Sequence, residues 1–405
     1  MSTERAEIIP MNSSSVLTRT QVLANTKALI PSLRERSAAA IEARCIPEAT
    51  IADFHDAGLF KIFQPKRYGG FELSPNALFE SQIEVATACP SSAWVLGVVS
   101  VHNWQLSLFP EETQEEVWGE KNSTLISSSY MPVGKVERVD GGFRLSGRWG
   151  FSSGSAHCDW VFVGAFIPPE EGAKGPDMRT FLVPRSDYKI EDTWYTSGLT
   201  ATGSNDVVID NVFVPERRTH KFSDGFRCKS PGNEVNDAPL YKIPFGQIFV
   251  RSVSTSAIGM AQGALDAYRE STKTRIGRAD GAKAAREPVA QRNCADAEIV
   301  IDREKQTLFG NFDEMMGYAE REERIPLERR ARFRYESSMA VSRCVEVVDK
   351  MFTSSGGRAI FLNDPMQRYF QDVHACRAHY ANNPEKPGLN FGSIQLELGN
   401  TDYFM

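Results

Sequence analysis

The middle third of this chain alternates apolar and polar residues as β-strands do, and it lies between two stretches with a helical pattern. The first helical stretch runs from Val16 to Leu108, the strand-like pattern begins at about Ser123, and helices return from about Ala238. No helical stretch separates one strand-like segment from the next. Because parallel strands need such crossovers, this order predicts an antiparallel sheet between two helical regions.

The predicted strands are short and are separated by loops rich in Pro and Gly, such as PPEEGAKGPD (168–177). The segment KVERVDGGFRLSGRW (135–149) predicts a β-hairpin that turns at Asp140-Gly141-Gly142. The same alternation predicts three further strands, in DWVFVGAFI (159–167), RTFLVP (179–184) and DVVIDNVFVP (206–215).

Helix starts are predicted at Ser74-Pro75 and Pro90-Ser91, because proline is preferred in the first turn of a helix. The segment after the second start (93–109) is apolar nearly all round, so we expect a helix that is buried on several sides. Near the end of the chain, three long stretches contain few helix breakers and predict an antiparallel bundle: 245–276, 285–322 and 326–354.

These patterns give an α+β fold class that is mainly α. We expect a flexible N-terminus, an N-terminal α-helical domain, a middle β-sandwich or barrel and a C-terminal helical bundle, at residues 1–15, 16–122, 123–235 and 236–405.

Composition excludes several kinds of partner. The net charge of -6 gives no basic surface for nucleic acid, and no apolar run is long enough to span a membrane. The N-terminal residues lack the apolar core of a signal peptide, so we expect a cytoplasmic protein. The seven cysteines contain no CxxC pair, which argues against a zinc site or a disulfide framework. No glycine-rich fingerprint links a strand to a helix, so we expect no NAD(P)H site.

The order of helices, β-domain and helical bundle resembles the acyl-CoA dehydrogenase architecture. Three motifs occur in the same order as in that family: DAGLFKIFQPKRYGG (56–70), GLTATGSNDVVIDNVFVPERR (198–218) and AIGMAQGALDAYRESTKTRIG (257–277).

Within that superfamily the chain resembles the two-component flavin-dependent monooxygenases (group D), which include the oxygenase component of p-hydroxyphenylacetate hydroxylase. Four segments carry this resemblance: SSAWVLGVVSVHNWQ (91–105), SSSYMPVGKVERVDGG (127–142), GRWGFSSGSAHCDW (147–160) and QRYFQDVHACRAH (367–379).

The resemblance implies a division of labour between two proteins. A separate NAD(P)H:flavin reductase supplies diffusible reduced FMN or FAD, which reacts with O2 in the oxygenase to form a flavin C4a-hydroperoxide. The terminal oxygen then passes to a small phenol-like or indole-like aromatic substrate. The resemblance also implies a homotetramer.

The resemblance assigns roles to residues around the substrate. It places His102 and Ser128 at the substrate hydroxyl and Trp94 in the wall of the pocket. Without the resemblance, His102 would be interpreted as an ordinary core histidine, and the serine run 127–129 as strand-edge filler. Either histidine role requires a hydrogen-bond partner for the buried ring.

A second group is assigned to the flavin by the resemblance. Ser153 is expected to accept a hydrogen bond from flavin N5, with Phe151 packing at the ring and Ser152 and Gly154 beside it. The alternative for Ser152-Ser153-Gly154 is a plain polar turn.

His374 and His379 lie five residues apart, about 140° around a helix, so they are not expected to face one pocket. The resemblance selects His379 as the base near the flavin, whereas His374 shares a face with Phe370 and is expected to be structural. The same geometry argues against a metal site formed by Asp372, His374, Cys376 and His379.

Cations near the end of one bundle helix are assigned to the flavin phosphates, often of a neighbouring subunit, although a solvated charged face would also explain them. The cofactor-binding residues predicted in the bundle are Lys273, Arg275, Gly356 and Gly357. In the oxygenase component of p-hydroxyphenylacetate hydroxylase, an arginine that supports the reduced flavin falls near the position of Gly246-Gln247. This chain has no cation there, and Arg251 is the nearest one.

Three alternatives remain open. An acyl-CoA dehydrogenase would need a glutamate base, for which Glu385 in a proline-flanked loop is the nearby candidate. A nitrogen- or sulfur-oxygenating enzyme would use the same fold with another pocket. A non-catalytic flavin-binding protein would have no reason to keep His102, Ser153 and His379 together.

Overall fold

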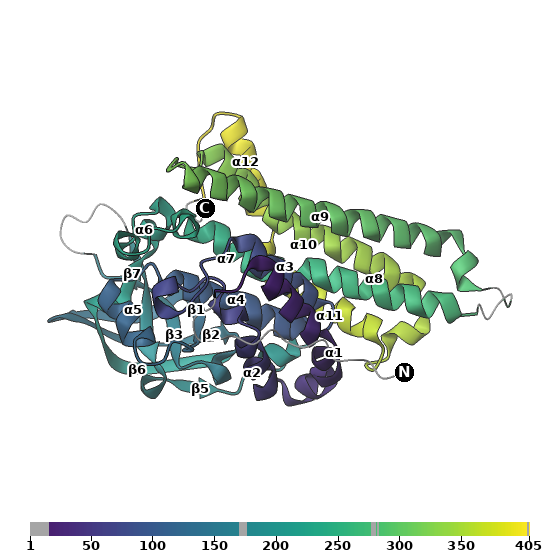
Figure 1. The fold of residues 1–405 in the computed structure, drawn as a ribbon, viewed down its shortest axis with the longest axis horizontal. Coiled ribbons are helices and arrows are strands. Elements are labelled where there is room, and N and C mark those ends of the chain that lie inside the picture. Colours follow the sequence, from purple (N-terminus) through teal and green to yellow (C-terminus); the bar gives the residue numbers. More distant parts are fainter. Residues whose placement is uncertain (1–15, 170–175, 277–280, 282, 403–404) are drawn as a thin grey trace.

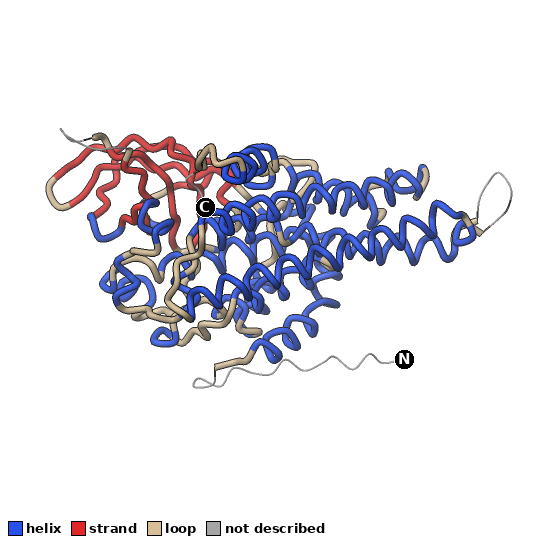
Figure 2. Tube along the Cα trace, turned by 90° about the horizontal axis from the view of Figure 1, so that it is seen from above, coloured by secondary structure: helices blue, strands red, loops and turns tan. Residues whose placement is uncertain are grey.

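The computed structural model describes residues 16–169, 176–276, 281, 283–402 and 405. The predicted flexible N-terminus (1–15) and most of the loop 168–177 lie outside the described residues. The expected order of helices, sheet and helices is confirmed (Figure 1). Figure 2 shows the strands gathered at one end of the molecule, with the longest helices extending away from them.

Five α-helices are described before the sheet: α1 (Arg19–Ala43), α2 (Glu48–Asp56), α3 (Pro75–Ala86), α4 (Pro90–Leu106) and α5 (Glu111–Trp118). Helices α3 and α4 start at the two predicted prolines. Every residue of α4 is buried, as its uniformly apolar sequence predicts. This helix packs against β1 (Ile126–Val139) on one side and α7 (Phe245–Ser254) on another, so it lies between the sheet and the bundle.

Seven strands form one sheet in the order β5-β6-β2-β1-β3-β4-β7. The remaining strands are β2 (Gly142–Ser152), β3 (Trp160–Ile167), β4 (Asp177–Pro184), β5 (Lys189–Glu191), β6 (Asn205–Pro215) and β7 (Thr219–Lys221). The predicted hairpin is confirmed, because β1 and β2 pair antiparallel with Val139 opposite Gly142.

One pairing among the described strands differs from the expected antiparallel pattern, because β1 and β3 run parallel. The register of β1 shifts between Ser129 and Gly134, around Pro132, which has no N–H to give to a ladder. A Cβ on Gly134 would stand 2.6 Å from the Trp149 ring, so this close approach requires glycine. The shift lets the first half of β1 pair with β3 and the second half with β2.

The helices of the C-terminal part are α7, α8 (Ser256–Thr274), α9 (Pro288–Glu320), α10 (Leu327–Ser354), α11 (Pro365–Arg377) and α12 (Glu385–Gln395), and α6 (Phe222–Arg227) follows the sheet. The predicted single stretch 245–276 is divided at Thr255. The hydroxyl of Ser252 donates a 2.7 Å hydrogen bond back to the Phe249 carbonyl, and such bonds bend helices. None of the helices in the described part of the chain is long and apolar enough to cross a membrane.

Candidate active site

A cavity of about 1160 Å³ lies where α4, the sheet and the C-terminal helices meet. Ligand pockets commonly have volumes of about 300–1,000 Å³, so this cavity has room for more than one small ligand. Apolar side chains from several elements form much of its wall: Val98, Tyr130, Phe166, Phe222, Phe249 and Val253.

Six of the residues predicted from the sequence line this one cavity: Trp94, His102, Ser128, Phe151, Ser153 and His379. They come from α4, β1, β2 with the turn after it, and the segment after α11, so the fold brings together residues that are far apart in the chain. The acidic residues among the described lining are Asp177 and Asp402, and no described glutamate takes part. Glu385, the base that an acyl-CoA dehydrogenase would need, is exposed at the start of α12.

Ser153 is held in the cavity wall by hydrogen bonds from both sides. The indole Nε1 of Trp94 donates to its Oγ at 3.0 Å, and the Oγ of Ser204 lies 2.7 Å from the same oxygen. Ser204 in turn lies 2.6 Å from Oγ1 of Thr202, whose hydroxyl reaches the Leu199 carbonyl at 2.9 Å. The Ser153 hydroxyl is therefore the first member of a buried chain of hydroxyl groups.

His102 presents one unpartnered nitrogen from the buried helix α4. Its Nδ1–H donates a 2.5 Å hydrogen bond to the Ile126 carbonyl, so the neutral ring carries its proton on that nitrogen. Its buried Nε2 has no partner among the described residues. Burial lowers the pKa of His102 to about 4, although the bond to Ile126 opposes this shift. At neutral pH the Nε2 atom is thus a hydrogen-bond acceptor in a residue that lines the cavity.

In His379 the ring proton lies on the other nitrogen. Its Nδ1 accepts the N–H of Ala381 at 3.2 Å, which leaves the proton of the neutral ring on Nε2. Burial, together with the nearby charge of Arg334, lowers the pKa of His379 to about 4. Asn382 fixes this turn, because its side chain donates to the carbonyls of Val253 at 2.9 Å and Cys376 at 2.8 Å.

The two histidines near the end of the chain are separated as expected, but for a different reason. The helix α11 ends at Arg377, so His379 follows it and caps a short 3-10 helix (Tyr380–Asn382). His374 stays on the helix, where it packs against Phe370 and lies 2.8 Å from Asp349. It does not line the cavity.

The residues predicted beside Ser153 divide between the cavity and the protein interior. Phe151 lines the cavity, is 66% exposed and has a φ of 65°, which is unusual for a residue other than glycine. Ser152 turns away, and its hydroxyl donates to Ser127 Oγ at 3.1 Å. Gly154 also has a positive φ, 70°, and a Cβ there would stand 2.9 Å from Val95, which explains the glycine.

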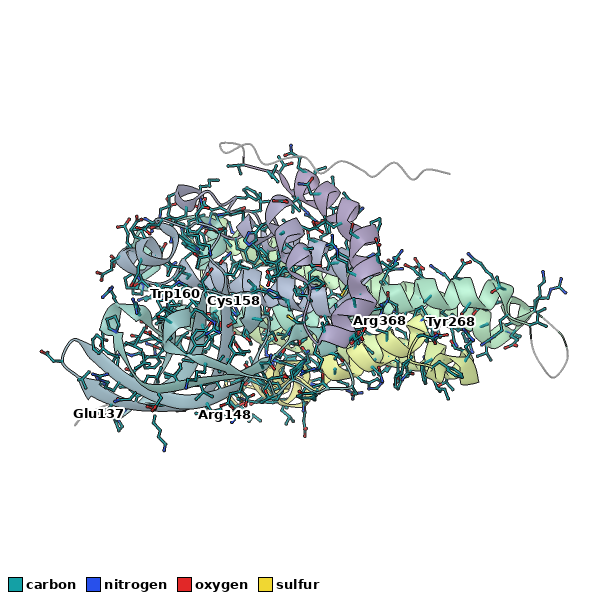
Figure 3. All side chains as sticks on the ribbon, turned by 90° about the horizontal axis from the view of Figure 1, so that it is seen from below. Glu137, Arg148, Cys158, Trp160, Tyr268 and Arg368 are labelled. Carbon is teal, nitrogen blue, oxygen red and sulfur yellow. The ribbon has the colours of Figure 1, made fainter. Side chains whose placement is uncertain are left out.

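The predicted phosphate-binding residues lie outside the cavity of their own chain. Lys273 and Arg275 lie at the end of α8, and Arg275 donates to the Ser354 carbonyl at 2.8 Å. Gly356 lies beside Arg275, and Gly357 follows it. Tyr268 belongs to the same part of the bundle, because its hydroxyl is hydrogen-bonded to Ser354 at 2.8 Å. Figure 3 shows Tyr268 far from the sheet, on which Glu137 and Arg148 are labelled.

Arg251 does not replace the arginine missing near Gly246. It is buried and does not line the cavity, and its Nη1 and Nη2 have no partner among the described residues. Burial lowers the pKa of Arg251 to about 10, against the opposing effect of Glu304 and Glu336. In the described part of the cavity wall, the one cationic side chain is Lys386, 3.5 Å from Asp402.

Several lining residues were not singled out by the sequence analysis. Thr202 and Ser204 lie within the motif 198–218, but nothing in the sequence indicates that their hydroxyl groups lie near Ser153. That proximity depends on the turn that the folded chain makes. Trp194, Thr401 and Asp402 also line the cavity, and no motif marks them.

Models of two known domains match the chain. The N-terminal domain of acyl-CoA dehydrogenases matches residues 24–122, and the C-terminal domain matches residues 252–384.

Full-length relatives give a more specific comparison. The oxygenase subunit HsaA, a flavin-dependent monooxygenase of Rhodococcus jostii, is 38% identical over 93% of this chain and 98% of its own length. The oxygenase component of the FADH(2)-dependent resorcinol hydroxylase of a Rhizobium species is 35% identical over 88% of this chain and 89% of its own.

A solved structure agrees with these relatives. The crystal structure of 3-HSA hydroxylase from Rhodococcus sp. RHA1 has a TM-score of 0.91 and 38% identity, and covers 95% of this chain and 98% of its own. The agreement extends from the helices before the sheet to the bundle after it. The chain therefore belongs to the oxygenase components of the flavin-dependent monooxygenases, which are built on the acyl-CoA dehydrogenase fold.

Proposed function

We propose that this protein hydroxylates a phenol-like aromatic substrate, with reduced flavin supplied by a separate NAD(P)H:flavin reductase and with O2 as the oxidant. One observation carries the proposal. His102 lines the cavity and carries on its buried Nε2 an acceptor with no partner among the described residues, and Ser128 lines the same cavity from β1. A phenolic hydroxyl is a donor that satisfies Nε2 and can also accept a hydrogen bond from Ser128. One relative is named a resorcinol hydroxylase, and resorcinol is a phenol, which is consistent with this substrate class.

The cavity also fits a flavin. Its volume exceeds what a phenol needs, and Ser153 offers a hydroxyl oxygen in the wall beside the exposed ring of Phe151. Ser153, Phe151 and Leu199 would hold the ring system. When bound, reduced flavin would supply the two electrons that activate dioxygen, and dioxygen is the source of the transferred oxygen atom.

The two histidines have different roles in this proposal. Because Nε2 of His102 is free of a proton, His102 holds the substrate hydroxyl and takes its proton as the ring is attacked. A neutral phenol does not lose its proton to a base with a pKa of about 4, so this transfer must accompany the attack. His379 was expected to be the base, but its Nδ1 is occupied by the Ala381 N–H. We assign it instead the role of a donor through Nε2–H.

The cavity wall is also largely apolar around its polar groups. Trp94, Val98 and Phe249 are buried side chains of this wall, and they surround the polar groups with an apolar environment. Apolar surroundings strengthen the hydrogen bonds of His102 and Ser153, and with flavin and substrate bound they would limit the loss of the activated oxygen as peroxide.

The assembly and location of the enzyme follow the same proposal. Since Lys273 and Arg275 lie away from the cavity of their own chain, we propose a homotetramer in which they serve the flavin phosphates of a neighbouring subunit. The seven cysteines are all free, which agrees with a cytoplasmic enzyme.

The test is anaerobic mixing of the protein with reduced FMN or FAD, followed by 18O2 and a panel of phenols and indoles. We expect a hydroxylated phenol that contains one atom of 18O, and a loss of about 100-fold or more in His102→Ala, the scale of a lost acid–base group. His374→Ala is the matched control, because His374 is a histidine outside the cavity. Oxygen incorporation at nitrogen or sulfur of another substrate, with none into phenols, would contradict the proposal.

A further inference from the structure

The hydroxyl chain behind Ser153 has a direction that is set at its far end. The Leu199 carbonyl can only accept, and it receives the hydroxyl of Thr202 at 2.9 Å. It also receives the Trp194 indole N–H at 3.0 Å and the Thr202 N–H at 3.1 Å. Three donors thus converge on this oxygen, which makes it the negative end of the chain.

The proton positions follow from that end. The single hydroxyl proton of Thr202 points to Leu199, so the 2.6 Å contact between Thr202 and Ser204 requires Ser204 to donate. The proton of Ser204 is then used, and the 2.7 Å contact between Ser153 and Ser204 requires Ser153 to donate. The proton of Ser153 therefore points to Ser204 and is not available to a ligand.

Ser153 is left as an acceptor toward the cavity. Its oxygen receives the Trp94 N–H at 3.0 Å, and one further lone pair remains. Ser153 lines the cavity, so that lone pair is available to a ligand bound there.

The backbone holds this arrangement in place. The N–H of Leu199 donates a 2.6 Å hydrogen bond to Oδ1 of Asp372 on α11. On the other side of the turn, the Gly154 N–H donates to the Thr202 carbonyl at 2.9 Å. The turn that carries Thr202 and Ser204 is thereby fixed both to the bundle and to the turn after β2, and the carbonyl of Leu199 keeps its direction.

We propose that Ser204 and Thr202 are positioning residues that fix Ser153 as a hydrogen-bond acceptor and thereby make the site prefer reduced flavin over oxidised flavin. The inference rests on the proposed function, in which Ser153 faces flavin N5. Reduced flavin has an N5–H that Ser153 can accept, whereas N5 of oxidised flavin presents only a lone pair. Two acceptors that face each other in a buried site repel and leave both groups unsatisfied.

The experiment measures the Kd of oxidised flavin and, under anaerobic conditions, of reduced flavin for the wild type and the variants. FMN is the probe, and its fluorescence or absorbance change on binding gives the Kd values. In Ser204→Ala the Ser153 hydroxyl is free to rotate and to donate to oxidised N5. We expect the ratio of the oxidised Kd to the reduced Kd to fall about tenfold, which is the scale of one hydrogen bond. Thr202→Val should lower the ratio in the same direction.

Three controls separate this role from a structural one. Ser204→Thr keeps the hydroxyl and should keep the wild-type ratio. Ser129→Ala removes another buried hydroxyl of the same cavity and should also leave the ratio unchanged. In a Ser153→Ala background, Ser204→Ala should have no further effect on the ratio, because the group that it orients is gone.

Two results would overturn the inference. One is an unchanged ratio in both Ser204→Ala and Thr202→Val, and the other is an effect of Ser204→Ala that persists without Ser153. If either occurs while the wild type still hydroxylates a phenol, only the positioning role is lost. A wild-type protein that binds flavin in neither oxidation state would instead refute the proposed function itself.

Discussion

The backbone N–H of Leu199 donates a 2.6 Å hydrogen bond to Oδ1 of Asp372, and this bond joins the cavity wall of the β-domain to the helix α11 of the bundle. Asp372 is buried, and burial raises its pKa to about 6. The bond is one link by which the two halves of the site keep their relative position.

Replacement of Asp372 should show what this link contributes. Asp372→Ala removes the acceptor, and we expect a loss of about 1–3 kcal/mol in the free energy of unfolding because the buried Leu199 N–H is left unpaired. Asp372→Asn keeps an oxygen acceptor and should lose less. Denaturant unfolding of the two variants at pH 7 measures both effects; equal losses would show that the hydrogen bond is not what Asp372 contributes.

The stability of the protein should fall on acidification from about pH 6.5 toward pH 4. Burial lowers the pKa values of His102, His220 and His379 to about 4, whereas in the unfolded chain they titrate near about 6.5. Between about pH 6.5 and about pH 4 these histidines bind protons in the unfolded chain but stay neutral in the folded protein. This difference stabilises the unfolded state by up to about 3 kcal/mol per histidine.

Asp372 acts in the opposite direction. Because its folded pKa is raised, its contribution is present at low pH and is lost as pH rises from about 4 to about 6. His220→Gln, outside the cavity, should reduce the net slope without changing the site. Unfolding free energies at pH 4.5, 5.5 and 7 test this, and identical slopes for the two proteins would contradict it.

Ser128 should contribute to substrate binding more than to folding. In Ser128→Ala we expect the KM for the phenol to rise about tenfold, the scale of one hydrogen bond to a ligand, while Tm changes little. Ser197→Ala, which also lines the cavity, is the matched control. Steady-state kinetics at saturating reduced flavin give the comparison, and an unchanged KM in Ser128→Ala would remove it from the substrate site.

Phe151 should show opposite effects on stability and on flavin binding. Its positive φ costs about 1–2 kcal/mol in a residue other than glycine. Its exposed ring packs edge-on against Trp194, with the two ring centroids 5.8 Å apart. We therefore expect Phe151→Gly to raise Tm and weaken flavin binding. Phe151→Ala should weaken flavin binding equally without raising Tm. Thermal unfolding and flavin titration of both variants test this; a lower Tm in Phe151→Gly would show that the ring stabilises the fold.

Arg275 should recognise the phosphate of the flavin and not its ring. We expect Arg275→Ala to raise the Kd for reduced FMN about tenfold and to leave that for reduced riboflavin, which has no phosphate, unchanged. Arg303→Ala changes an exposed arginine on α9 and serves as the control. A proportional loss of affinity for both flavins would assign Arg275 a structural role instead.

Much of the fold could be predicted from the sequence because its signals are local. Periodicity and proline positions located the helices α3 and α4, and Asp140-Gly141-Gly142 located the hairpin. The parallel pairing of β1 with β3 could not be found in this way, since it depends on a register shift within β1 around Pro132. The end of α11 before His379 was also missed, because no proline or glycine marks it.

The site could be predicted only in part. The resemblance selected His102, Ser153 and His379, which line one cavity, but it did not indicate which ring nitrogen carries the proton. That depends on backbone groups of Ile126 and Ala381, which become neighbours only in the folded chain. The hydroxyl chain through Ser204 was missed for the same reason.

The cavity draws its walls from segments near residues 94, 128, 153, 202 and 379, so no single segment contains a working site. During synthesis on the ribosome, a nascent chain lacks part of the wall until residue 379 has emerged. A partly made or partly unfolded chain therefore lacks part of the wall around the proposed flavin and substrate sites.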